Sequence, residues 1–359
     1  LLLSLFPLSV FLSLRLIRLP WLVAGIGALL ATHISTDGLY GLDPPSFLWR
    51  GYGLTSQLFA MIPLPLAIAS SWRYFSTSQF SILSPRRRVA EGGDNSQFFS
   101  SIFFLVATTS GHLGLGIIAI LSLIPLVFVE PIMLFIHQWN NEAMKHLKNN
   151  VVKLFLLSAT TIFFLSYWII PILLGDNYHN ISVWDPPWKF NSFGAKEIMI
   201  RLFNGDLFDF GRFPVLTLLV IVGIFACLWK TAVKIGNVWP QANKTDNEKP
   251  STYYLLPTAY CSFPFLFLFF LLLYFGRTTW GGLIDLIPGM KEFHLSRFIV
   301  GLHATGFFLI PIGFWWLAEN VSSVIHHVSK QIFTNLESRI SLLRRGFGGQ
   351  ANLETYIRL

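Results

Sequence analysis

The stretch FIVGLHATGFFLIPIGFWWLA, residues 298–318, carries no acidic or basic side chain apart from one histidine. A helix of about 20 apolar residues crosses the hydrocarbon core of a bilayer. Further stretches of similar character lie at residues 54–72, 97–110, 113–137, 151–174, 213–229 and 252–275. They are long and rich in Leu and Phe, whereas the strands of a membrane barrel are short and alternate. The sequence therefore predicts an all-α protein, a polytopic transmembrane helical bundle.

The composition agrees with this prediction. The chain is 53% hydrophobic and only 12% charged, whereas soluble domains are about a quarter charged. The net charge of +8 comes from basic residues spread among the loops, which favours membrane lipids as partners and speaks against nucleic acid. Cys227 and Cys261 lie inside apolar stretches and form no metal-ligand or redox motif. We expect no metal and no cofactor.

The distribution of Lys and Arg predicts the orientation in the membrane. When the stretches alternate in direction, 18 of the 26 basic residues fall on one side and 8 on the other, and the richer side is expected to be cytoplasmic. This topology needs about nine passes, with short ones at residues 20–32 and 97–110. The chain starts with LLLSLFPLSVFLSL, inside an apolar run. We interpret this start as a truncated pass of a longer protein.

The predicted organisation has two regions and one large loop. Residues 1–318 form the transmembrane region, and residues 319–359 form a cytoplasmic C-terminal tail. Residues 175–212 form the largest non-cytoplasmic loop, whose second half has the pattern of an amphipathic surface helix. We expect an integral multi-pass protein of a prokaryotic plasma membrane.

The large loop contains an aromatic turn, Trp184-Asp185-Pro186-Pro187-Trp188. Proline restricts its own φ and the conformation of the preceding residue, so the two indoles and the carboxylate would be held stiffly. Indole faces stack on sugar rings, and Asp185 would accept hydrogen bonds from sugar hydroxyls. The alternative is an aromatic belt at the membrane interface, where Trp gathers in most membrane proteins.

Two further side chains are candidate ligands. His112 stands at the junction of two apolar stretches, and Arg297 directly precedes the last one. A polar group near membrane depth is a functional candidate, and a guanidinium matches the geometry of phosphate. Each has a structural alternative: His112 would bond only to backbone carbonyls, and Arg297 would reach lipid headgroups. Asp37 and Asp43, in the first outer loop, are interpreted as turn formers or, alternatively, as a general base or metal ligand.

Three passages carry a resemblance to a known family. They are STDGLYGLDPPSFLWRGYGLTSQLFAMIPLPLAIA at residues 35–69, ATTSGHLGLGIIAILSLIPL at residues 107–126 and LIPGMKEFHLSRFIVGLHA at residues 286–304. Their layout resembles the polytopic membrane proteins called 6-pyruvoyl-tetrahydropterin synthase-related, which are similar to GT-C-type glycosyltransferases. The resemblance spans about residues 10–318, and nothing in it points to pterin chemistry.

The resemblance implies transfer of a sugar from a polyprenyl-phosphate donor on the non-cytoplasmic face. In such enzymes the catalytic acid follows the first span, which we expect to precede this chain, and neither Asp37 nor Asp43 matches that motif. We therefore leave the catalytic residue unassigned and expect a substrate-binding set of His112, Trp184, Asp185, Trp188 and Arg297. The alternatives are a transporter or flippase of a lipid-linked or amphiphilic substrate and a non-catalytic membrane scaffold.

Overall fold

The structure is a computed structural model that describes residues 1–37, 41–45, 55–83, 94–137, 141–175, 186–238, 260–287 and 289–346. The chain divides into two compact units, Leu1–Phe314 and Trp315–Leu359. Among the described residues there is no strand; a single parallel bridge joins Ser35 to Asp209. The predicted all-α class is thus confirmed for the part of the chain that is described.

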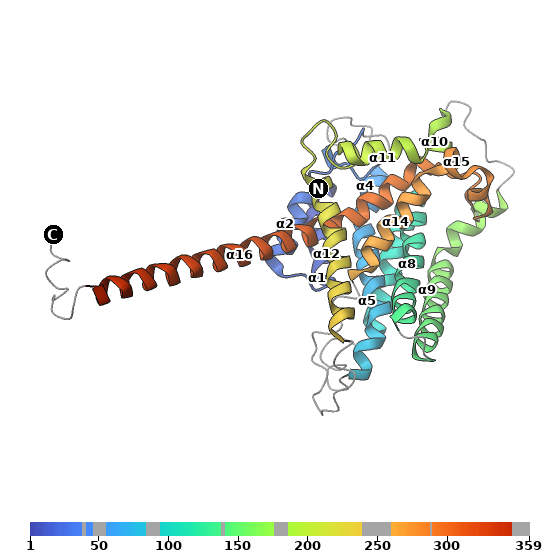
Figure 1. The fold of residues 1–359 in the computed structure, drawn as a ribbon. Helices are drawn as coiled ribbons and strands as arrows, with labels where there is room; N and C mark the ends of the chain where they lie inside the picture. The colour runs from blue at the N-terminus through green and yellow to red at the C-terminus, as the bar shows by residue number, and fades with distance from the viewer. Residues whose placement is uncertain are drawn as a thin grey trace. The chain divides into compact units, whose positions relative to one another are not determined.

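The first unit is a bundle of helices of very different lengths (Figure 1). In chain order they are α1 (Leu2–Leu16), α2 (Trp21–Ala31), α4 (Thr55–Met61), α5 (Pro63–Leu83), α7 (Asp94–Gly111), α8 (Leu113–His137), α9 (Asn141–Leu174), α10 (Pro187–Asn191), α11 (Ala195–Asn204), α12 (Val215–Val238), α14 (Ser262–Tyr274), α15 (Gly276–Trp280), the 3₁₀ turns η3 (Gly281–Leu286) and η4 (Leu295–Phe298), and the start of α16 (Ile299–Gly346).

Long apolar helices of the kind found in membrane proteins are present, but nine passes are not. Three helical segments of the described chain are long and apolar enough to cross a bilayer: Thr55–Ser76, Met144–Ile172 and Leu295–Ser322. A fourth is possible if Ser262–Tyr274 and Gly276–Leu286, bent by 79°, count as one span. The prediction of about nine passes was wrong because several apolar stretches form helices of only 10–17 residues in the described part, such as α1 and α2, and a full span needs about 20.

The helices pack around the beginning of α16. Its residues 299–313 are all buried, whereas α9 exposes large apolar side chains such as Phe155, Phe163 and Tyr167. Within the bundle, α5 packs against α1, α7 and α8. An apolar helix that is buried all round belongs to a core, and one with exposed Phe suits a lipid-facing position. The beginning of α16, residues 299–313, therefore forms the centre of the first unit.

Two glycines let α12 and α16 touch through their backbones. A Cβ atom added to Gly223 would lie 2.2 Å from the carbonyl oxygen of Leu309, and one added to Gly313 would lie 2.2 Å from that of Leu219. The contact therefore uses a Leu-x-x-x-Gly pattern on both helices. Small residues such as glycine let the backbones of membrane helices approach closely.

Short elements gather at one end of the bundle, where α10, α11 and α15 lie near one another (Figure 1). α10 packs against η4 and α15, and α11 packs against α15. α11 buries Ile198 and Leu202 and exposes Ile200 and Phe203, which fits the predicted amphipathic helix. The sequence pattern located this element; its docking on α15 comes from the structure.

The second unit is described up to Gly346 and is helical, because α16 continues without a break through Ser322 to Gly346. Its described part exposes Val321, Ile325, Ile332 and Leu336. The two units meet four residues before the predicted end of the transmembrane region at residue 318. The assignment of residues 319–359 to the cytoplasm stays a prediction.

Candidate functional site

His112 is the one non-helical residue between α7 and α8. Its backbone continues the helical bonding on both sides, since His112 N donates to Thr108 O at 3.0 Å and Gly116 N donates to His112 O at 2.9 Å. The ring acts as a cap of α8, because Leu115 N donates to Nδ1 at 3.3 Å and so satisfies one of the free N–H groups of the first turn. The neutral ring then carries its proton on Nε2.

The environment keeps the His112 imidazole neutral at pH 7. Burial, and in second place the positive charge of Arg297, lowers the pKa of His112 from 6.5 to about 4. Loss of water disfavours the charged ring, and a neighbouring guanidinium repels a second positive charge. His112 therefore presents a neutral N–H donor beside a permanent cation.

Arg297 lies in η4, where its backbone N donates to His294 O at 3.0 Å. Arg297 and His112 line the same small cavity, together with the polar Gln57 and with Gly114, Leu115 and Val300. The cavity volume is about 10 Å³, close to what one water molecule needs. At Gly114 an added Cβ would lie 2.9 Å from Arg297 Nη1 and 3.0 Å from His112 Cε1, so the missing side chain lets the two groups approach each other.

Trp188 stands in α10, beside η4. The Ser296 hydroxyl donates to Lys189 O at 2.9 Å, and the ring centroids of Phe190 and His294 are 4.2 Å apart. These contacts join the two residues that follow Trp188 to two residues that precede Arg297. Trp188 itself stacks on Phe193 with centroids 5.4 Å apart and 17° between the planes. Part of its indole surface is therefore already used within the protein.

Only part of the aromatic turn lies within the described residues. Trp184 and Asp185 lie outside the described residues, so their predicted role stays a prediction. Of the five predicted ligands, the structure places His112 and Arg297 at one cavity and puts Trp188 on the neighbouring element.

Arg277 holds this end of the bundle together, and the sequence analysis did not single it out. Its Nε donates to Asp285 Oδ1 at 2.9 Å, its Nη1 to Phe190 O at 2.8 Å, and its Nη2 to Lys291 O at 2.9 Å and to Met290 O. One planar fork thereby fixes α10, η3 and the segment before η4. The sequence feature that could have indicated this role is an arginine just after an apolar stretch. The same feature is equally typical of an arginine that anchors a helix at the membrane interface.

Two loops are also tied to α16 through His303. Leu42 N donates to His303 Nδ1 at 2.9 Å, and His303 Nε2 lies 2.7 Å from Leu207 O. The ring is fully buried, and both its nitrogens bond to backbone of loops far apart in sequence. A histidine inside the apolar stretch 298–318 was a visible signal, because polar groups at membrane depth are rarely without a role.

The two acidic residues of the first loop have structural partners. Asp43 is buried and accepts from Thr36 N at 3.1 Å, which fits the interpretation as a turn former. Asp37 lies 3.5 Å from Arg201, which also bonds to Glu197 at 2.9 Å and stacks its guanidinium 4.2 Å from the Phe193 ring centroid. No group of three His, Cys, Asp or Glu side chains suitable for a metal occurs in the described segments.

The comparisons with known proteins add no assignment. No family model matches the chain, and no curated protein or solved structure matches it. Function is therefore inferred from the residues and their geometry.

Proposed function

We propose that this chain is part of a multi-pass membrane protein of the GT-C glycosyltransferase type, acting on the non-cytoplasmic face of a prokaryotic plasma membrane. Its outer end would bind a polyprenyl-phosphate sugar donor. Arg297 would bind the phosphate, the Nε2–H of His112 would donate a hydrogen bond to it, and Trp188 would stack on the sugar.

The observation that carries this proposal is the shared cavity of His112 and Arg297. A cation and a neutral N–H donor side by side make a complementary pair for a phosphate oxygen, and hydrogen bonds to a charged acceptor are about twice as strong as neutral ones. The lowered pKa of His112 supports the donor role, because the ring stays neutral at pH 7 and keeps its Nε2 proton.

The size of the cavity sets a condition on the proposal. A volume of about 10 Å³ cannot hold a phosphate, since ligand pockets enclose about 300–1,000 Å³. Binding therefore requires α10 and η4 to move away from the junction of α7 and α8. The Ser296–Lys189 hydrogen bond joins η4 to α10, so the two elements can move together without breaking it.

The proposal is tested by binding of a long-chain polyprenyl phosphate to the purified chain in detergent, followed by tryptophan fluorescence. We expect Arg297→Gln and His112→Gln to weaken binding by about tenfold or more, because each removes a charge-assisted contact worth about 1.5–3 kcal/mol. Lys291→Gln is the matched control on the same segment, since Lys291 is exposed and lies outside the cavity. Lys330→Ala, in the second unit, is a second control.

A polyprenol without the phosphate separates recognition of the headgroup from that of the chain. We expect it to bind the original protein and Arg297→Gln equally weakly. Equal affinity of all variants for the phosphate form, or equal losses in Arg297→Gln and Lys291→Gln, would remove the proposed site. In the enzyme that contains the catalytic acid, the same two cavity variants should lower activity far more than Lys330→Ala.

A further inference from the structure

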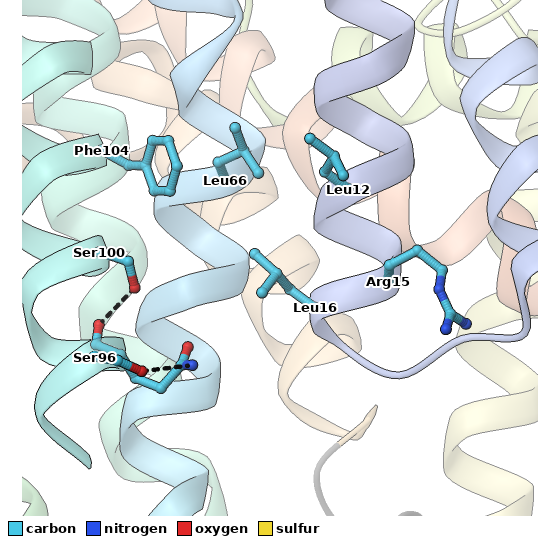
Figure 2. Close-up of a pocket in the computed structure, with 8 residues that line it drawn as sticks. Leu12, Arg15, Leu16, Leu66, Ser96, Ser100 and Phe104 are labelled. Atoms are coloured by element: carbon cyan, nitrogen blue, oxygen red, sulfur yellow. Dashed lines mark hydrogen bonds between the residues drawn. The ribbon is translucent and has the colours of Figure 1, made fainter. Parts of the chain in front are cut away.

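A second, larger cavity opens between α1 and α7, over the side of α5. Its volume is about 470 Å³, within the range of ligand pockets. Leu12 and Leu16 on α1 face Leu66 on α5 and Phe104 on α7 across it (Figure 2). These four side chains make a groove with an apolar lining.

The groove has a polar end. Ser96, Gln97 and Arg15 line the same cavity, and Figure 2 shows Ser96 and Arg15 at the end where α7 begins and α1 finishes. The distance from Ser96 to Phe104 is eight residues of helix, or about 12 Å along the axis. An apolar channel of this length with polar groups at one end matches an amphiphile rather than a sugar or an ion.

The positive charge at the polar end is not neutralised by the described protein. Arg15 is exposed, and its guanidinium donates to Leu19 O, three residues beyond the end of its own helix. It forms no ion pair with another described residue. Four of its five N–H donors remain for an anion, and its aliphatic stem covers part of the groove.

Gln97 offers a second unsatisfied group in the same place. Its Oε1 is buried and has no hydrogen-bond partner among the described residues, while its Nε2 reaches Ser96 Oγ only at 3.5 Å. A buried carbonyl oxygen without a donor costs about 1–3 kcal/mol. A ligand with a hydroxyl group near its charge would remove that cost.

We propose that this groove is a binding site for an anionic phospholipid with a hydroxylated headgroup, such as phosphatidylglycerol. The phosphate lies at Arg15, a headgroup hydroxyl donates to Gln97, and an acyl chain follows Leu12, Leu16 and Phe104. In the predicted topology this end faces the cytoplasm, where anionic lipids attract basic side chains. The site is separate from the His112 cavity, because Gln97 lies near the start of α7 and His112 directly follows its end, fifteen residues or about 22 Å along the axis.

The test is native mass spectrometry of the delipidated chain titrated with phosphatidylglycerol or with phosphatidylcholine of the same acyl chains. We expect one saturable site that prefers phosphatidylglycerol by about fivefold, since one Arg at a membrane surface is worth about 1 kcal/mol. Arg15→Gln should bring this preference to about one. Lys148→Gln is the control for charge: Lys148 is exposed on α9, outside the groove, and its loss should leave the preference unchanged.

A second pair of variants tests the apolar part. Leu12→Trp fills the groove from an exposed position, whereas Leu8→Trp adds the same side chain one turn earlier on α1, also at an exposed position outside the lining. We expect Leu12→Trp to abolish the saturable site for both lipids and Leu8→Trp to leave it intact. Equal effects of Arg15→Gln and Lys148→Gln, a saturable site that survives Leu12→Trp, or full competition by inorganic phosphate would each overturn the proposal.

Discussion

The close contact of α12 and α16 allows a sharp test of the fold. At Gly223 and at Gly313 an alanine Cβ would lie 2.2 Å from a carbonyl oxygen of the other helix, whereas ordinary contact begins near 3.4 Å. Neither obstacle is the flexible end of a side chain, because both oxygens belong to helix backbone. The two helices must therefore separate locally by about 1.2 Å, the difference between 3.4 and 2.2 Å, or α16 must bend.

The expected cost follows from overpacking. Forcing extra atoms into a tightly packed core costs about 1–3 kcal/mol, and the obstacle here is rigid, so we expect about 2–3 kcal/mol for Gly223→Ala and for Gly313→Ala. The double variant should cost less than the sum, because one displacement of the helices accommodates both methyl groups. Such coupling is expected for residues in one contact.

For the control variant we expect a change in stability of the opposite sign. Gly25 lies in α2, and a Cβ added there would meet nothing within 4 Å. Gly25→Ala should therefore stabilise the protein by about 0.5–1 kcal/mol, since Ala has the higher helix propensity. The assay is reversible unfolding of the detergent-solubilised chain by SDS, followed by tryptophan fluorescence. If Gly223→Ala and Gly313→Ala both fall within about 0.5 kcal/mol of the original protein, the α12–α16 contact is wrong.

Three further predictions concern single residues. The Asp209 carboxylate accepts hydrogen bonds from Leu216 N at 3.0 Å and from Thr217 N at 2.8 Å. Asp209→Ala should lower the free energy of unfolding by about 2 kcal/mol, because it leaves these two N–H groups unsatisfied. The SDS assay should show a smaller loss for Asp209→Asn. The folded pKa of His112, about 4, lies below its unfolded value of 6.5, so unfolding proceeds with proton uptake and stability should fall as pH drops from about 6.5 to about 4. The ring is partly exposed, so the loss should be about 1–2 kcal/mol, and a His112→Gln variant with the same pH slope would refute this. Cysteines placed at Lys148 and at Lys196, both exposed, should react with a membrane-impermeant maleimide from opposite sides; labelling from one side would contradict the topology.

The sequence predicted the helical class because apolar side chains and a backbone that must bond internally leave few choices in a bilayer. It also located α11, whose amphipathic pattern is local, and the junction at His112, where the apolar run is interrupted by glycines. It overestimated the number of passes. The apolar stretch 252–275 illustrates why: the described part ends in α14 and then bends by 79° into α15 and η3, a change of direction that hydropathy does not report.

For the candidate site, too, the sequence predicted some features and only the structure supplied the others. Residue type alone indicated His112 and Arg297, because a polar group at the edge of an apolar stretch is costly and therefore informative. Their approach to one cavity, the fork of Arg277 and the two backbone bonds of His303 depend on contacts between segments far apart in the chain. The sequence by itself determined which segments become apolar helices, because that choice depends on local composition and periodicity. Only the tertiary structure decided which of their ends meet, because that depends on the packing of backbones such as those at Gly223 and Gly313.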